Sequence, residues 1–205
     1  MSILVVAEHD NDSIKTATLN TVTAAQAIGD DVHVLVVGVG CQAAVAAAAE
    51  IAGVAKVINA DNEAYAHQLP ENVAPLLVEL AKNYSHILSA ATTTGKNLMP
   101  RAAALLDVAQ ISDIIEVKSE DTFVRPVYAG NAMATVQSSD SVKMITVRTT
   151  AYAEASQGGN ATIENCDFVT TQNVATFVSE QLSVSERPEL TAASIVISGG
   201  RGMQN

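Results

Sequence analysis

The sequence contains few basic residues. Eleven Lys and Arg stand against 22 Asp and Glu, which gives a formal net charge of −11 over 205 residues. A protein that binds duplex nucleic acid needs clustered cations to displace the counterions of the phosphates, and this sequence has no run of Lys or Arg. We therefore expect no nucleic acid among its partners.

Cysteine is also scarce. Cys41 lies in an apolar segment with a helical pattern, whereas Cys166 lies far along the chain in a polar loop. This spacing fits no metal site, redox motif or disulfide framework. We predict two free thiols.

Long apolar runs are missing as well. Residues 43–49 form one of the longest, far short of the roughly 20 residues that span a bilayer. We therefore expect no transmembrane segment. Met1 leads directly into the strand-like ILVVAEH, with no charged leader or cleavage site. From this we expect a cytoplasmic protein.

The chain does contain enough apolar residues to bury a core. Its composition is 48% hydrophobic and 16% charged, which excludes intrinsic disorder as the main state. Its length suits one domain of about 150 residues, with a remainder too small for a second complete domain.

Residues 1–110 alternate short β-branched runs with helical patterns, which predicts repeated strand–helix units. The expected strands are 3–7, 32–37, 56–60 and 87–91, and the expected helices are 16–28, 41–52, 70–82 and 97–106. The strands VHVLVVGV and SHILSAA are apolar on both faces, so their sheet needs helices on both sides. This predicts an α/β fold with a doubly wound, mainly parallel sheet.

Glycine and proline mark the expected helix boundaries. Gly29 and Gly53 stand where a helix needs a left-handed residue after its end. Pro70 and Pro100 stand where a first helical turn tolerates a missing N–H.

After Ile114 the pattern changes to period two. FVRPVYAGNAMATVQ and then SSDSVKMITVR predict antiparallel ribbons, with Pro126 in an edge strand or bulge. Residues 151–165 are small and polar without periodicity, so we expect a mobile loop there. For 168–190 a short helix and an extended arm both stay open. We assign residues 1–190 to one α/β domain that includes the loop and a connecting arm.

Residues 191–205 read as the start of a further domain. The run SIVIS predicts a strand, and Gly199–Gly202 form a glycine turn with no helix after it. We therefore expect a C-terminal domain that is cut short after its first strand. Backbone N–H groups of such a turn can approach a phosphate while Arg201 binds the phosphate oxygens, but an ordinary glycine turn is equally compatible with the residues.

The remaining motifs show no catalytic arrangement. TTTGKN at 92–97 fails as a phosphate loop, because Ala90 replaces its first glycine and Asn97 its magnesium-binding hydroxyl. No GxSxG motif and no Cys/His pair is present. The histidines lack metal-ligand spacing and are expected to be surface or packing residues: His9, His33, His67 and His86. We expect no catalytic and no metal-binding residue.

Four blocks of sequence, in this order, resemble the electron-transfer flavoprotein α subunit. They are TTTGKNLMPRAAALLDV at 92–108, RPVYAGNAMATV at 125–136, KMITVRTTAY at 143–152 and RPELTAASIVISGGRG at 187–202. The resemblance covers essentially the whole chain. It implies an adenine-nucleotide-hydrolase-like α/β domain followed by a C-terminal domain that carries FAD.

The resemblance also implies partners. The family forms a heterodimer with a β subunit and is an electron carrier, not an independent enzyme. It passes electrons from flavin dehydrogenases, such as acyl-CoA dehydrogenases, to the electron-transfer flavoprotein ubiquinone oxidoreductase. We expect residues 1 to about 190 to form the platform that docks the β subunit and supports the flavin domain, with apolar anchors from the ribbon that holds Tyr128 and Met133. The alternative is that this ribbon is a sheet that covers only its own core.

For the cofactor, the resemblance carries over only Arg201, which is expected to contact the phosphate or adenylate portion of FAD. Full-length α subunits continue well past SGGRG and take most flavin contacts from that part, so we expect this chain alone not to retain FAD. The rival interpretation is a universal-stress-like adenine-nucleotide-binding module, with EHDNDS at 8–13 after the first strand. Asp10 and Asp12 in that loop would repel a phosphate.

Overall fold

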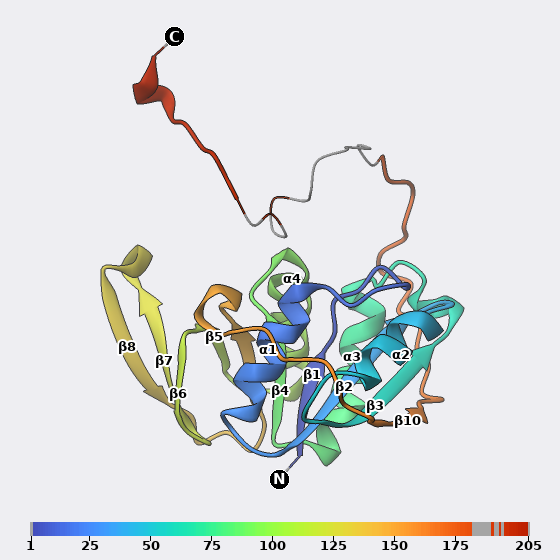
Figure 1. Cartoon of the computed structure of the whole chain (residues 1–205). Coiled ribbons are helices and arrows are strands. Elements are labelled where there is room, and N and C mark those ends of the chain that lie inside the picture. Colours follow the sequence, from blue (N-terminus) through green and yellow to red (C-terminus); the bar gives the residue numbers. More distant parts are fainter. Residues whose placement is uncertain (1, 182–189, 191–192, 194, 205) are drawn as a thin grey trace.

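The computed structural model contains one large and one small sheet, and it describes residues 2–181, 190, 193 and 195–204 (Figure 1). The strands of the large sheet are β1 (Ser2–Val6), β2 (Asp31–Gly38), β3 (Val54–Asp61), β4 (His86–Ala90), β5 (Gln110–Ile114), β9 (Lys143–Val147) and β10 (Thr162–Asn165). They lie in the order β10-β3-β2-β1-β4-β9-β5, and every neighbouring pair is parallel. The predicted α/β fold with a mainly parallel sheet is confirmed.

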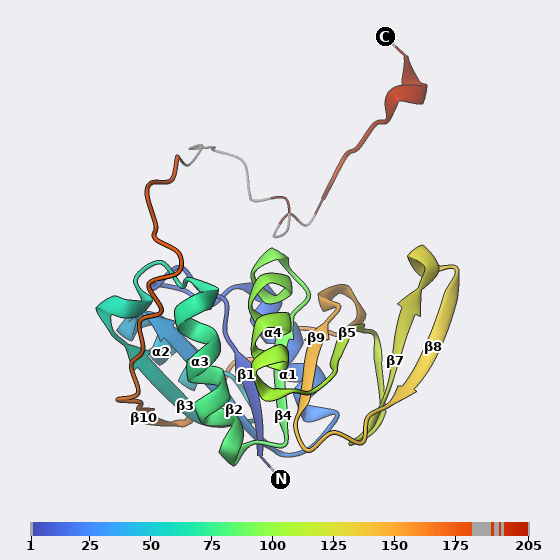
Figure 2. The same ribbon diagram turned by 180° about the vertical axis from the view of Figure 1, so that it is seen from behind.

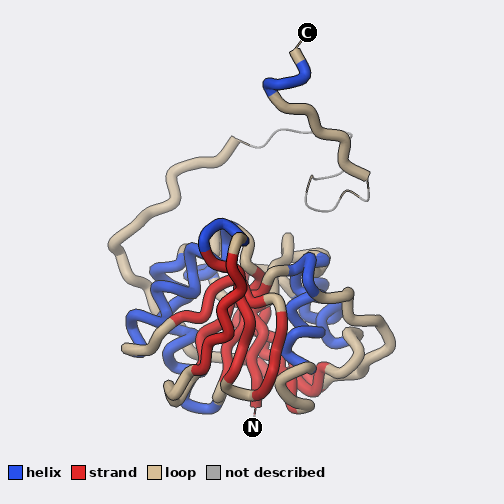
Figure 3. Tube along the Cα trace, turned by 90° about the vertical axis from the view of Figure 1, so that its left-hand side faces the viewer, coloured by secondary structure: helices blue, strands red, loops and turns tan. Residues whose placement is uncertain are grey.

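Helices cover both faces of this sheet. They are α1 (Thr16–Gln26), α2 (Gln42–Ala49), α3 (Pro70–Leu80) and α4 (Thr93–Leu106). α1 and α2 lie on one face, α3 and α4 on the other, as the front and back views show (Figures 1 and 2). The view turned by 90° shows three layers, with the strands between two layers of helices (Figure 3).

The alternation along β1 shows why the strands are apolar throughout. Ile3 and Val5 belong to the core beneath α1 and α2, whereas Leu4 and Val6 belong to the core beneath α3 and α4. Because successive side chains of a strand point to opposite faces, both sets must be apolar when both faces are covered.

The small sheet is an antiparallel ribbon with the order β6-β7-β8, formed by β6 (Glu116–Ser119), β7 (Thr122–Val127) and β8 (Ala132–Gln137). β8 pairs with β7 along its whole length, but β6 reaches only to Val124. Pro126 therefore lies beyond the end of β6, where its missing N–H interrupts no ladder. The ribbon predicted for this part of the sequence is confirmed.

The second predicted ribbon is wrong. Residues 143–147 form β9, a parallel strand that lies between β4 and β5 in the large sheet. Met144, Ile145, Thr146 and Val147 are all buried, so this strand is covered on both faces. Residues 138–141 have the composition of a tight turn, which made the strand after them look like the second strand of a hairpin. In the structure that strand instead joins the large sheet in parallel with β4 and β5.

The boundaries of α4 also differ from the prediction. The helix begins at Thr93, not at residue 97, and the hydroxyl of Thr92 accepts a hydrogen bond from the Gly95 N–H at 3.3 Å. Pro100 therefore lies inside the helix instead of in its first turn. The left-handed residue that ends α4 is Asp107, whose φ is 55°. Gly53 has the predicted left-handed backbone (φ 80°), but Gly29 is not among the positive-φ residues.

Residues 152–165, which we call the return segment, are not a free loop. Ala155 N–H donates to Leu19 O at 3.3 Å, and the N–H groups of Gly158 and Gly159 both donate to Glu50 O. The segment thus crosses α1 and α2 and ends as β10, which pairs with β3. The prediction missed β10 because all four of its residues are exposed and show no apolar pattern.

Two further predictions concern the C-terminal part. Of 168–190, residues 182–189 lie outside the described residues, and 168–181 contain neither a helix nor a strand. Of the predicted strand SIVIS, Ser194 lies outside the described residues, and Ile195–Ser198 form no strand with any described residue. Within the described parts of the chain, no helix combines the length and apolar character of a membrane span.

Candidate functional site

The glycine turn near the C-terminus holds the only cofactor residue that the sequence analysis named. Arg201 begins a single 3-10 turn (Arg201–Met203) and is exposed, as are Gly199, Gly200 and Gly202. Among the described residues, none forms a hydrogen bond or ion pair with the Arg201 guanidinium. A large cofactor such as FAD requires many contacts along its length, and one exposed arginine does not supply them. By itself, this turn supplies one exposed cation for a phosphate.

The tip of the β6–β8 ribbon carries two exposed apolar side chains. The exposed fraction is 83% for Tyr128 and 59% for Met133. The tip backbone is left-handed at Tyr128 (φ 51°), Ala129 (φ 55°) and Gly130 (φ 88°). For residues other than glycine, this conformation costs roughly 1 kcal/mol each. A strained backbone thus holds an exposed tyrosine at the end of the ribbon.

The edge of the ribbon is unprotected against further pairing. β8 has the sequence AMATVQ, which contains no charge and no proline, and among the described strands it pairs only with β7. Natural edge strands usually carry charges, prolines or bulges that prevent another strand from adding. The opposite edge, β6, follows that rule through Glu116 and Lys118, which form an ion pair at 2.6 Å. β8 does not follow it.

The base of the ribbon packs against the body of the protein. Phe123 is fully buried and belongs to the core beneath α1 and α2, with Val117 and Val136 packed beside it. The ribbon thus covers its own core at one end and exposes apolar surface at the other. The base of the ribbon therefore fits a sheet that covers its own core, and docking of a partner at the tip stays a prediction.

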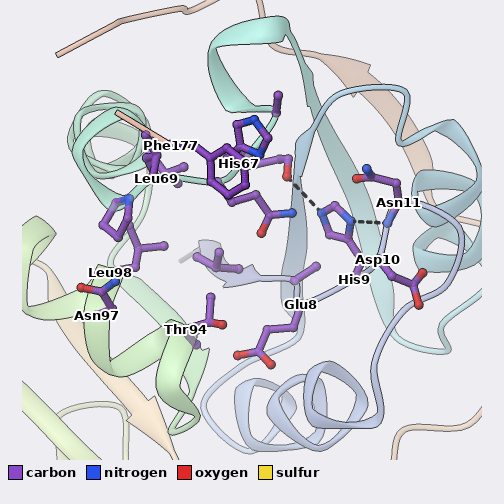
Figure 4. Close-up of a pocket in the computed structure, with 18 of the residues that line it drawn as sticks. Glu8, His9, Asp10, Asn11, His67, Leu69, Thr94, Asn97, Leu98 and Phe177 are labelled. Carbon is purple, nitrogen blue, oxygen red and sulfur yellow. Dashed lines mark hydrogen bonds between the residues drawn. The ribbon is translucent and has the colours of Figure 1, made fainter. Parts of the chain in front are cut away.

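A cavity of about 550 Å³ lies at the carboxyl ends of the central strands. From β1 the chain builds the sheet in one direction, through β2 and then β3. β4 is added on the opposite side of β1. The chain therefore changes direction between β1 and β4, and in open α/β sheets ligands bind at such a switch point. The cavity is lined by Glu8, His9 and Asn11 after β1 and, from other segments, by His67, Leu69, Asn97, Leu98 and Phe177. Figure 4 shows that the Glu8 carboxylate points away from Leu69 and Phe177.

Burial shifts the pKa values of both Glu8 and His9. Burial raises the pKa of Glu8, and a hydrogen bond from the Thr92 hydroxyl only partly offsets this. The pKa of His9 is lowered, mainly by burial, which favours the neutral ring. His9 Nδ1 accepts from the Asn11 N–H at 3.1 Å, and Nε2 donates to Val37 O at 3.1 Å. Both ring nitrogens of His9 are therefore already used.

The loop at 92–97 is not a phosphate cradle. A Cβ on Gly95 would lie 2.0 Å from the carbonyl oxygen of Ala90, so this glycine makes room for β4 and not for a ligand. Lys96 and Arg101 do not line the cavity. Arg101 Nη1 lies 3.8 Å from Glu71 Oε1. The rejection of a phosphate loop agrees with this geometry.

The histidines have different surroundings. His86 is buried and donates to Glu120 O, whereas His33 lies between Asp31 and the Tyr84 hydroxyl. His67 stacks on Phe177, with ring centroids 3.7 Å apart. Among the described residues, no group of three His, Cys, Asp or Glu could hold a metal ion. Cys41 and Cys166 are both free thiols, as predicted.

Sequence reasoning missed several residues of the cavity. It treated as connections the segments that supply His67, Leu69 and Phe177. It considered Asn97 only as the residue that replaces the hydroxyl of a phosphate loop. The rule that ligands lie beyond the carboxyl ends of parallel strands could have grouped residues 8–11 with 94–98. No sequence signal would have placed Phe177 beside them.

Comparison with known proteins agrees with the resemblance in the sequence. The family model "Electron transfer flavoprotein domain" matches residues 3–170. The chain is 63% identical over 206 residues to electron transfer flavoprotein subunit alpha of Pseudomonas aeruginosa, covering 100% of this chain and 67% of the relative. It is 52% identical to the protein of the same name from Bradyrhizobium diazoefficiens, covering 100% and 65%.

A third relative, electron transfer flavoprotein subunit alpha of Paracoccus denitrificans, is 45% identical, covering 99% of this chain and 66% of the relative. The chain thus spans about two thirds of the length of these curated relatives. Family model and relatives agree over the α/β body and the ribbon. The chain therefore belongs to the electron transfer flavoprotein family, in which its relatives bear the name of the alpha subunit.

Proposed function

We propose that this chain is the α-subunit part of a heterodimeric, FAD-containing electron carrier, and that the β6–β8 ribbon docks the β subunit. The observation that carries this proposal is the uncharged, exposed edge of β8 beside Tyr128 and Met133. A partner strand can add to such an edge through backbone hydrogen bonds, while the two side chains supply apolar anchors. The names of the relatives support the family role.

Several finer points belong to the same proposal. The electron donors are flavin dehydrogenases such as acyl-CoA dehydrogenases of fatty acid β-oxidation, and the acceptor is electron-transfer flavoprotein ubiquinone oxidoreductase. Bound FAD would carry the electrons, and this chain's own part is to support and position the partner surfaces. The cytoplasmic location and the division into residues 1–190 and 191–205 also stay predictions.

For FAD itself, we propose that Arg201 contacts its phosphate or adenylate portion in the whole protein. The test is a visible absorption spectrum of the purified chain after incubation with FAD and gel filtration. We expect no flavin band at about 450 nm, because one arginine cannot replace the many contacts of a flavin site. A stoichiometric band would show that the cofactor site lies within these 205 residues.

The docking proposal is tested by co-purification of the chain with its cognate β subunit. The double variant Tyr128→Ala/Met133→Lys removes an anchor and places a charge on the β8 edge, so we expect the complex to weaken at least about tenfold. Leu105→Ala is the matched control, because Leu105 is also apolar and 54% exposed but lies on α4. Equal loss in both variants, or no loss in the double variant, would show that the ribbon is not the docking surface.

A further inference from the structure

A second cavity, of about 340 Å³, lies between the ribbon and β5, the edge strand of the large sheet. The start of β5, Arg125 on β7, the end of β8 and the turn after β8 line it, and we call it the ribbon cavity. We propose that it binds a small aliphatic α-amino acid as the zwitterion, with the carboxylate on Arg125 and the ammonium group at Asp140 and Gln110. This inference does not depend on the proposed function, because neither the apolar side chains at the ribbon tip nor Arg201 line the ribbon cavity.

The strand pairing within the ribbon directs Arg125 inward. Arg125 follows Phe123 by two positions on β7, and alternate side chains of a strand share one face. Arg125 therefore lies on the face of the ribbon that Phe123 buries against the body of the protein. Its partner across the ladder is Ala134, whose single methyl group fills little of the space beside the guanidinium. The ribbon thus places a cation between itself and β5.

This cation has no partner within the described parts of the chain. The Nε atom of Arg125 is buried, and no described residue forms a hydrogen bond or an ion pair with its guanidinium. A buried donor without a partner costs free energy, and the cost is larger when the donor is charged. The planar fork of a guanidinium matches the two oxygens of a carboxylate. A carboxylate is therefore the group that would satisfy Arg125.

The ribbon cavity also contains acceptors that lack a donor. The Oδ2 atom of Asp140 accepts from the Ala109 N–H at 3.0 Å and from the Ser138 hydroxyl at 3.3 Å, whereas its Oδ1 atom accepts from no described residue. The Oε1 atom of Gln110 is buried and has no partner among the described residues, because only the amide nitrogen of this side chain is bonded, to the Ser112 hydroxyl. These two oxygens would be satisfied by a group with several donors.

Arg125 and Asp140 carry opposite charges in one cavity, yet they form no ion pair with each other. A phosphate would be repelled by Asp140, and an amine without an acid group would be repelled by Arg125, so the lining disfavours both simple classes of ion. A zwitterion fits both charges. Its carboxylate accepts from Arg125, and its ammonium group, which has three donors and no acceptor, donates to the free oxygens of Asp140 and Gln110.

The size and the apolar lining of the ribbon cavity limit the side chain of the amino acid. Its volume of about 340 Å³ lies near the lower end of the range for small-molecule sites, which is roughly 300 to 1,000 Å³. Ile111 and Val136 supply its apolar wall, and none of the described residues that line it is aromatic. A short branched side chain would bury its surface against these two residues. The ligand class is therefore a small aliphatic amino acid such as valine.

The test compares L-valine with two compounds that each lack one of its charged groups, 3-methylbutanoate and isobutylamine. Each is titrated into the ¹⁵N-labelled 205-residue chain while amide shifts are recorded by NMR. We expect L-valine to shift the amides of residues 109–111 and 137–140 with a Kd of about 1 mM. Each of the other two compounds loses a charge-assisted interaction, so we expect both to bind at least about tenfold more weakly.

Arg125→Gln removes the cation of the ribbon cavity, so it should weaken the binding of L-valine at least about tenfold. Arg101→Gln is the matched control, since Arg101 is exposed on α4 and outside this cavity, and should leave the affinity unchanged. The proposal is overturned if L-valine gives no saturable shift of these amides, or if either of the other two compounds binds as tightly as L-valine. Equal affinity of wild type and Arg125→Gln, or an equal loss in both variants, would also overturn it, and the comparison of the three compounds on the wild type holds even if Arg125→Gln fails to fold.

Discussion

At Gly95, the first turn of α4 passes so close to the end of β4 that a side chain has no room. A Cβ there would lie 2.0 Å from the Ala90 carbonyl oxygen and 2.8 Å from the Ser89 hydroxyl. Backbone atoms cannot move aside as the end of a flexible side chain can. The close approach of α4 to the sheet, and with it one wall of the cavity, depends on this glycine.

We therefore expect Gly95→Ala to lower the free energy of unfolding by about 1 to 3 kcal/mol, as overpacking commonly does. Gly29→Ala serves as the control, because its Cβ would meet only Ile3 Cδ1 at 3.4 Å. That substitution should change stability by no more than about 0.5 kcal/mol. Urea unfolding of the three proteins measures both effects, and an equal cost for the two variants would contradict this account of α4.

Among the elements, the ribbon has one large, fully buried side chain at its base. Phe123 on β7 is fully buried in the core beneath α1 and α2, while the ribbon tip projects away from it. We expect Phe123→Ala to lower the free energy of unfolding by about 3 to 5 kcal/mol. Hydrogen exchange should show that amides of β7 and β8 lose more protection than those of β1.

Tyr128→Ala on the same ribbon is the comparison for that experiment. Its side chain is 83% exposed, so we expect little change in the free energy of unfolding. If Tyr128→Ala destabilised the chain as much as Phe123→Ala, the division of the ribbon into a buried base and an exposed tip would be wrong.

The elements also show which parts of the fold could be predicted from the sequence. The first four strands and four helices follow from apolar periodicity, because each is long enough to show it and each is covered by the core. β9 and β10 could not be placed that way. The neighbours of β9 are distant in sequence, and β10 exposes all four residues, so only the pairing with β3 makes it a strand. The cavity likewise required the strand order, because residues 8–11 and 94–98 come together only through the adjacency of β1 and β4.

At the scale of the whole molecule, buried histidines link stability to pH. His86 is 1% exposed, and its pKa is lowered mainly by burial. Its neutral ring donates from Nε2 to Glu120 O at 2.6 Å and accepts at Nδ1 from the Ser85 hydroxyl at 2.8 Å. In the unfolded chain the same ring takes up a proton near its ordinary pKa of about 6.5. Below that pH the unfolded state binds more protons than the folded state, so this contribution to stability is lost as the pH falls.

We therefore expect wild type to lose more stability than His86→Gln when the pH is lowered from about 7.5 to about 5.5. The comparison with the variant cancels the change in net charge and the opposite effect of Glu8, whose pKa is raised. Urea midpoints at the two pH values provide the measurement. Parallel pH profiles for the two proteins would mean that His86 titrates alike in the folded and unfolded states.

The return segment has a consequence for the protein while it is still being synthesised. β10 is the only described neighbour of β3 on its outer side, yet Asn59 and its partner Asn165 are 106 positions apart. At a translation rate of about 5 to 20 residues per second, the outer edge of β3 stays unpaired for at least several seconds before β10 has been synthesised. An open edge invites pairing with other nascent chains. Lys56, the third residue of β3, places a charge on that edge until β10 is added, and its Nζ then pairs with Glu164 Oε2 at 2.8 Å.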